Sequence, residues 1–261
     1  MKLSFVSEGD GPPVVILHGL FGSGRNWAGI AKQLAASRRV YLVDARNHGE
    51  SPWADTMTYA EMAQDVVDFI AAENLDRPVV AGHSMGGKIA MTVALSHGDR
   101  LGGLVIIDIA PVAYGVRFDN FVEAMQGLDL SAVARRADAD GLLAVHVPDP
   151  GIRAFLLHNL VAQDGGYRWR INLDAIAANN QALAGFGAGF GAGFEAGSAY
   201  DGPALVLCGA DSDYVLPEHE LEIRRLFPQA AIDRIAGAGH WLHADQPGQL
   251  MDRLEGFLEA L

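Results

Sequence analysis

Residues 78–87 of this 261-residue chain read PVVAGHSMGG, and this stretch decides the fold. PVVA is a short apolar run typical of a buried strand, and the residues after it have helical composition. Between them, GHSMG (82–86) matches G-x-S-x-G, in which a serine occupies a sharp turn from strand to helix. The turn raises the Ser84 hydroxyl from the sheet, and the backbone N–H groups of the new helix point to the same place. Ser84 is therefore the candidate nucleophile, in preference to a surface serine in a glycine-rich turn.

Similar apolar runs recur along the chain and alternate with helical patterns. Most are rich in Val and Ile without polar alternation, as strands buried on both faces of a parallel sheet are. A capping-box signature at 58–61 begins one helix, and the leucines of 247–261 share one face of another. This alternation predicts an α/β fold with a mostly parallel, doubly wound sheet. The predicted strands are 13–18, 39–44, 78–83, 104–109, 204–209 and, more weakly, 231–237.

The alternation breaks between about Pro111 and Asp201, where the pattern predicts several helices and no strong strand. An insertion of this size predicts a helical cap over the carboxyl edge of the sheet, where ligands bind in such folds. We therefore expect a core of residues 1–111 and 202–261 and a cap of residues 112–201. The cap ends in the low-complexity segment GFGAGFGAGF (185–194). Helices are predicted over 120–127, 139–146, 151–162 and 172–184.

Composition argues against several classes of function. A net charge of −13 without a Lys/Arg cluster argues against a nucleic-acid partner. No apolar run is long enough to span a membrane, and the N-terminus does not resemble a signal peptide, so we expect a cytoplasmic protein. The single cysteine, Cys208, is interpreted as a buried strand thiol rather than a nucleophile. Histidine spacing suggests no metal site, and no phosphate-binding glycine motif calls for a cofactor.

A serine nucleophile needs a base, and nine histidines compete for that role. His240 lies in AGAGHWLH after the last predicted strand, where the glycines indicate a loop at the sheet edge. It also follows Ser84 in chain order, as this type of fold requires. His243 is the secondary candidate, whereas His18 and His83 are interpreted as structural hydrogen-bonding residues.

Acyl-transfer chemistry also needs two main-chain donors facing the oxyanion that forms on the substrate. The N–H of Met85, directly after the candidate nucleophile, is the first. The loop HGLFG (18–22) supplies the second, for which we select Leu20, with Phe21 as the alternative.

Taken together, HGLFG, DARNHGES, GHSMGG and GAGHW resemble the α/β-hydrolases along the whole chain. More narrowly, HGLFGS, RNHGES, GHSMGGK and IDIAPV are similar to bacterial esterases of the YbfF type and their abhydrolase-domain-11-like relatives. This resemblance implies hydrolysis of a small-molecule carboxylic ester, with a short- to medium-chain acyl or an aryl group, without a cofactor.

The resemblance also bears on the acid that orients the histidine. Many α/β-hydrolases carry it three residues after a glycine that ends a late strand, and counting from Gly209 places Ser212 there. YbfF-type esterases have a serine at this place and take the acid from the preceding strand, which implies Asp108 here and an auxiliary role for Ser212. An aspartate in so apolar a run is costly to bury unless it is paired. Asp211 and Asp213 remain the alternative acids.

The same triad serves thioesterases, C–C bond hydrolases, lactonases and acyltransferases, which remain alternatives. Serine at position 84 argues against dehalogenases and epoxide hydrolases, which need an aspartate there. A non-catalytic ligand-binding member of the fold is a further alternative, although such chains usually lose the nucleophile or the base. Large apolar residues are candidates to line an acyl or aryl pocket: Phe118, Phe121, Phe155, Leu156, Trp169, Phe186 and Trp241.

Overall fold

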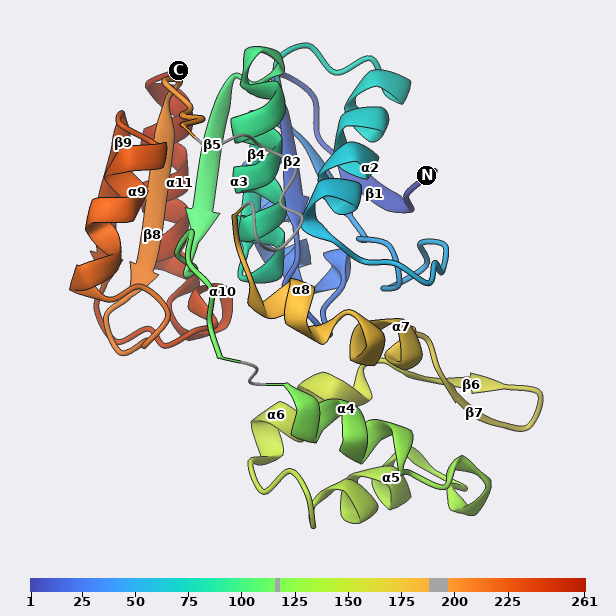
Figure 1. Cartoon of the computed structure of the whole chain (residues 1–261). Coiled ribbons are helices and arrows are strands. Elements are labelled where there is room, and N and C mark those ends of the chain that lie inside the picture. The colour runs from blue at the N-terminus through green and yellow to red at the C-terminus, as the bar shows by residue number, and fades with distance from the viewer. Residues whose placement is uncertain (116–117, 188–196) are drawn as a thin grey trace.

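A seven-stranded sheet runs through the computed structural model, which describes residues 1–115, 118–187 and 197–261 (Figure 1). The strand order is β1-β3-β2-β4-β5-β8-β9, with β1 antiparallel to β3 and all other neighbours parallel. This order confirms the predicted mostly parallel sheet. The strands are β1 (Phe5–Glu8), β2 (Pro13–Leu17), β3 (Arg39–Val43), β4 (Val79–His83), β5 (Gly103–Ile107), β8 (Ala204–Gly209) and β9 (Ala230–Ile235).

The sequence pattern predicts six of these strands and misses β1. Its four residues, FVSE, alternate between half-buried and exposed positions, because this strand lies at the sheet edge. A short edge strand of this kind lacks the continuous apolar run that identifies the central strands.

Helices cover both faces of the sheet, each over its own layer of buried apolar side chains. One face carries α2 (Tyr59–Ala72), α3 (Met85–His97) and α9 (Glu220–Leu226), and the other carries α1 (Ala28–Leu34), α10 (Leu242–Asp245) and α11 (Pro247–Glu259). The capping box predicted at Thr58 is present, since its hydroxyl accepts a hydrogen bond from the N–H of Glu61. In the described residues, no helix is long and apolar enough to cross a membrane. Short 3-10 helices occupy Gly24–Trp27, Gly98–Arg100, Leu130–Ala132 and Pro217–His219.

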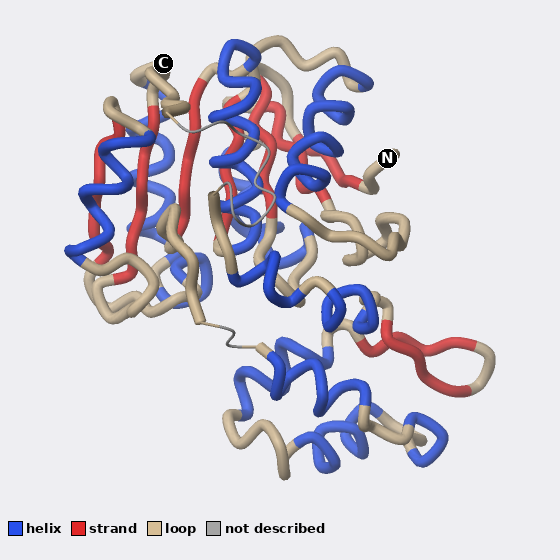
Figure 2. The backbone as a smooth tube through the Cα atoms, in the orientation of Figure 1, coloured by secondary structure: helices blue, strands red, loops and turns tan. Residues whose placement is uncertain are grey.

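The inserted segment lies beyond the carboxyl ends of the strands, toward which the arrowheads of β5 and β8 point (Figure 1). The pattern predicts no strong strand here, and the structure contains one short pair, in which β6 and β7 form an antiparallel hairpin (Figure 2). Asp164 and Gly165 form its turn with φ of 51° and 82°, the left-handed conformations that Asp-Gly supplies in two-residue hairpins. The elements are α4 (Asp119–Gln126), α5 (Arg136–Leu143), α6 (Pro150–Leu157), β6 (Leu160–Gln163), β7 (Gly166–Trp169), α7 (Leu173–Ala178) and α8 (Asn180–Ala184).

Three predicted helices also differ from the structure. The helix expected over 139–146 begins and ends three residues earlier, as α5. The helix expected over 151–162 ends at Leu157, where the chain turns into the hairpin, and the one expected over 172–184 is divided at Asn179. Most of the Gly/Phe segment, from residue 188 to its end, lies outside the described residues.

Candidate active site

Ser84 occupies the turn between β4 and α3 in a conformation that few residues adopt. Its φ is 53° and its ψ is −117°, and its N–H donates to the carbonyl of Ile107 on the adjacent strand at 3.0 Å. A Cβ on Gly82 would lie 2.0 Å from the carbonyl oxygen of Gly86, and one on Gly86 would lie 2.4 Å from that of Leu17. The glycines on both sides of Ser84 are therefore required by the close backbone approach that the sequence motif predicts.

A chain of two hydrogen bonds connects Ser84 to a buried carboxylate. His240, in the loop between β9 and α10, places Nε2 3.0 Å from the Ser84 Oγ and Nδ1 2.8 Å from Oδ2 of Asp108. The carbonyl of His240 accepts a hydrogen bond from Nε2 of His83 at 2.7 Å. The ring of Tyr214 stacks on the imidazole, with 3.8 Å between the two ring centres. These contacts hold the imidazole between its two partners. The structure thus brings together three residues that lie far apart in the sequence.

Asp108 follows β5 and is fully buried, with both carboxylate oxygens occupied. Oδ1 accepts the N–H of Gly209 at 2.9 Å, and Oδ2 accepts the hydroxyl of Ser212 at 2.5 Å in addition to the histidine. Asp211 and Asp213 are exposed in the loop after β8. Between the acids considered from the sequence, the one in contact with the imidazole is therefore Asp108, with Ser212 beside it.

The loop after β2 makes a tight turn next to Ser84. The N–H of Gly22 donates to the carbonyl of Gly19 at 3.0 Å, and Phe21 has φ of 62°, which identifies a turn usually completed by glycine. Two side chains hold Phe21 in this conformation. Its N–H donates to Nε2 of His48 at 3.2 Å, and its carbonyl accepts from Nδ2 of Asn159 in the inserted segment at 2.7 Å.

The backbone of this turn distinguishes between Leu20 and Phe21, the two candidates for the second oxyanion donor. The N–H of Phe21 is already bound to a side chain, whereas within the described residues the N–H groups of Leu20 and Met85 have no acceptor. Leu20 and Met85 also border one cavity together with Ser84. This arrangement favours Leu20 over Phe21 as the second donor.

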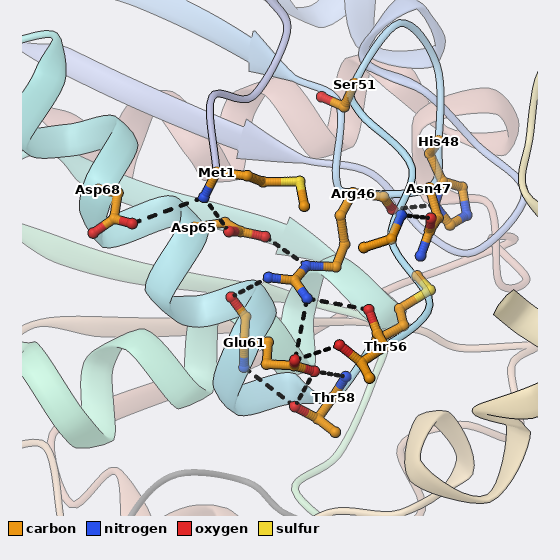
Figure 3. Close-up of polar contacts among 12 residues, drawn as sticks. Met1, Arg46, Asn47, His48, Ser51, Thr56, Thr58, Glu61, Asp65 and Asp68 are labelled. Carbon is orange, nitrogen blue, oxygen red and sulfur yellow. Dashed lines mark hydrogen bonds and ion pairs between the residues drawn. The ribbon is translucent and has the colours of Figure 1, made fainter.

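His48 is held as an acceptor by the loop after β3, shown in Figure 3. Its Nδ1 lies 3.0 Å from the carbonyl of Arg46, so the proton occupies Nδ1 and Nε2 is left to accept from Phe21. Burial, followed by the proximity of His18, lowers the pKa of His48 to about 3, which keeps the ring neutral. The buried Arg46 in turn donates to Asp65 at 2.7 Å, fixing the loop on α2 (Figure 3).

A mostly apolar cavity of about 200 Å³ opens beside Ser84 and His240. Five of the seven apolar residues predicted to line a pocket do so. Trp169 instead donates to the carbonyl of Met125 at 2.9 Å, and Phe186 packs against Tyr59. His243 also borders the cavity, stacked on Trp27 at 4.5 Å. The five predicted lining residues are Phe118, Phe121, Phe155, Leu156 and Trp241.

Two of the other predicted roles can be compared with the structure. Burial lowers the pKa of His243 to about 4, which keeps it neutral, and its ring forms part of the cavity wall. Cys208 is fully buried in β8, and burial raises the pKa of its thiol to about 12, as a structural thiol requires. In the part of the chain that the structure describes, no group of His, Cys, Asp and Glu is arranged to hold a metal ion.

Four residues that contact this site have no role predicted from the sequence: His48, Asn159, Tyr214 and Lys88. The sequence position of Tyr214 indicates that it lies near the site, since it follows Ser212 by two residues in the same loop. The position of Lys88 gives a similar indication, since it is a lysine in the apolar helix directly after the nucleophile. The roles of His48 and Asn159 depend on contacts across 27 and 138 residues, which no local pattern reveals.

Comparison with known proteins places the chain in a family. A profile described as the alpha/beta hydrolase fold matches residues 12–247. The sn-1-specific diacylglycerol lipase ABHD11 of Mus musculus is 41% identical over 95% of this chain and 81% of its own length. Esterase YbfF of Escherichia coli is 37% identical over 94% of this chain and 92% of its own. A solved marine microorganism esterase superposes with a TM-score of 0.93 at 38% identity, over 98% of this chain and 99% of that one. The chain therefore belongs to the alpha/beta hydrolase fold family and is a hydrolase related to named esterases and lipases.

Proposed function

We propose that this hydrolase is a serine carboxylesterase that cleaves short- to medium-chain acyl or aryl esters through an acyl-enzyme. The observation that carries the proposal is the hydrogen-bonded series from Ser84 through His240 to Asp108 at the mouth of an apolar cavity. The esterase and lipase names of the relatives agree with it.

In the proposed mechanism, Nε2 of His240 takes the proton of Ser84 as its Oγ attacks the ester carbonyl. Asp108 fixes the proton of the neutral ring on Nδ1 and stabilises the imidazolium that forms. The N–H groups of Leu20 and Met85 bind the oxyanion, and His240 then protonates the leaving alcohol. Water activated by the same histidine releases the acid and regenerates Ser84. Ser212 adds a third donor to Asp108 and keeps the carboxylate oriented toward the ring.

We also propose that residues 112–201 act as a cap over this site. Phe118, Phe121 and Phe155 of this segment line the larger cavity, so the segment supplies much of the surface that a substrate would meet. Asn159 joins it to the oxyanion loop through the carbonyl of Phe21.

The test is hydrolysis of p-nitrophenyl esters across a series of acyl lengths, with wild type beside Ser84→Ala. We expect the variant to lose about 10⁶-fold in kcat, because the nucleophile is removed from a unit that acts together. The preferred chain length measures the acyl space of the site. Turnover by the folded wild type that does not exceed that of Ser84→Ala would contradict the proposal, and thioesters assayed alongside test the thioesterase alternative.

A further inference from the structure

A lysine that the proposed mechanism does not use is buried one helical turn after Ser84. Lys88, in the first turns of α3, is only 2% exposed. Its Nζ donates to the main-chain carbonyls of Ala184 and Gly185 at 3.1 and 2.7 Å. An ammonium group has three N–H donors, and these two bonds use two of them, so one N–H can still donate to a ligand.

The charge of this group has no counter-ion in the described residues, where its partners are carbonyls and aromatic rings. Nζ lies 4.8 Å from the ring centre of Tyr114 and 5.5 Å from that of Tyr59. Removing a cation from water without an opposite charge is costly, and burial lowers the pKa of Lys88 to about 7. A buried charge kept at this cost beside a catalytic centre is typical of a site that recognises a ligand.

Lys88 lines a second, smaller cavity next to the nucleophile. This cavity is small, with a volume of about 30 Å³, and its walls include Tyr59, Tyr114 and Ala184, the same groups that surround Nζ. Ser84 contributes to this cavity as well as to the larger one. A substrate bound at Ser84 therefore has one space with a buried cation and another that is apolar.

The position of His240 indicates which part of an ester enters each space. Among the described residues, His240 borders the larger cavity and not the smaller one. The leaving alcohol must take its proton from Nε2 of His240, so the alcohol part lies on the larger, apolar side. Of the two residues whose N–H groups face the oxyanion in the proposed mechanism, Met85 borders the smaller cavity and Leu20 borders both. The acyl part then extends toward Lys88.

We propose that the smaller cavity is a subsite for an acyl group that ends in a carboxylate, with Lys88 as the counter-ion of that carboxylate. The preferred substrates are then half-esters of short dicarboxylic acids with an apolar alcohol. One helical turn separates Ser84 from Lys88, a rise of about 5.4 Å, which suits a short spacer between the two carboxyl groups. This inference rests on the esterase function proposed above.

The test compares hexyl hydrogen succinate with hexyl succinamate, in which a neutral amide replaces the carboxylate. The measured quantity is the ratio of kcat/KM for the two esters, followed by chromatography of released hexanol. We expect wild type to favour the succinate, and Lys88→Met to lower the ratio at least tenfold, because it removes the charge and keeps the length of the side chain. Lys32→Met, which removes an exposed positive charge from α1, should leave the ratio unchanged. An equal ratio in wild type and Lys88→Met would overturn the subsite.

Two further measurements keep the inference testable. If Lys88→Met does not fold, the ratio in wild type should fall as pH rises from 6 to 9 and Lys88 loses its proton, and a constant ratio refutes the subsite. If wild type shows no Ser84-dependent hydrolysis of any ester, the proposed function fails. The subsite is then measured by calorimetry on Ser84→Ala, which should bind hexyl hydrogen succinate at least tenfold more tightly than hexyl succinamate. Equal binding would refute it.

Discussion

The replacement Asp108→Asn tests the assignment of the acid most directly, because the surroundings of this side chain determine how the amide must lie. Oδ1 of Asp108 accepts the N–H of Gly209, while Oδ2 accepts from both Ser212 and His240. An asparagine has one oxygen to offer. If that oxygen faces the histidine, the NH₂ group faces the N–H of Gly209 and leaves a buried donor unpaired, at a cost of about 1–3 kcal/mol.

The favoured orientation of the introduced amide therefore keeps its oxygen on Gly209 and turns the NH₂ group toward Nδ1 of His240. Nδ1 must then accept a hydrogen bond, so the proton of the neutral ring moves to Nε2. A ring protonated at Nε2 cannot take the proton of Ser84. Loss of the correct tautomer typically lowers kcat by about 10⁴-fold, which corresponds to about 5.4 kcal/mol of activation free energy.

The assay is p-nitrophenyl butyrate hydrolysis by wild type and Asp108→Asn at neutral pH, with circular dichroism to establish that both are folded. Asp211→Asn and Asp213→Asn are the matched controls, since each neutralises one carboxylate of the neighbouring loop. We expect Asp108→Asn to lose about 10⁴-fold in kcat and the two controls to remain within a few-fold of wild type. The reasoning is refuted if Asp108→Asn keeps near-normal activity, or if a control loses as much.

Three further outcomes follow from individual contacts. Ser212→Ala removes one charge-assisted hydrogen bond to the carboxylate but leaves the imidazole bond, so kcat should fall about 10- to 100-fold, and a loss as large as that of Asp108→Asn would contradict this. Asn159→Ala should lower kcat about tenfold with little change in KM, because the oxyanion loop loses its bond to the inserted segment. Asn179→Ala, which breaks two other bonds between the inserted segment and the core, should not lower kcat in this way. Equal effects of the two variants would exclude a role of Asn159 in positioning the oxyanion loop. His48 has a folded pKa of about 3 against 6.5 when unfolded, so it binds its proton more readily in the unfolded chain. The contribution of neutral His48 to the free energy of unfolding is complete above pH 6.5 and declines by about 1.4 kcal/mol per pH unit as pH falls toward 3. Between pH 6.5 and 5, the Tm of His48→Gln should therefore decrease less than the Tm of wild type.

The sheet was predictable because its central strands are buried on both faces and so consist of continuous Val- and Ile-rich runs. Where burial is partial, this signal disappears, as it does in β1 and in the hairpin of β6 and β7. The hairpin turn, Asp164-Gly165, was a local signal that the surrounding helical composition concealed.

The candidate site divides in the same way between local and distant determinants. Ser84 and its glycines form one local turn, so a short motif is sufficient to find them. Chain order and the glycine-rich loop around His240 predict its role. The contacts of Asn159 and His48 with Phe21 arise only when three segments meet in the fold, and no pattern along the chain encodes that meeting.

The position of the acid has a physical explanation in the neighbouring strands. β5 and β8 run parallel in a register that pairs Ile107 with Leu207, and the N–H of Asp108 donates to the carbonyl of Leu207 at 2.8 Å. The ends of both strands therefore face Nδ1 of His240. A carboxylate at the end of either strand could contact this nitrogen. Two carboxylates there would repel each other, and the pKa of one would rise. With Asp108 on β5, the loop after β8 presents the hydroxyl of Ser212, which donates a hydrogen bond to the acid instead of competing with it.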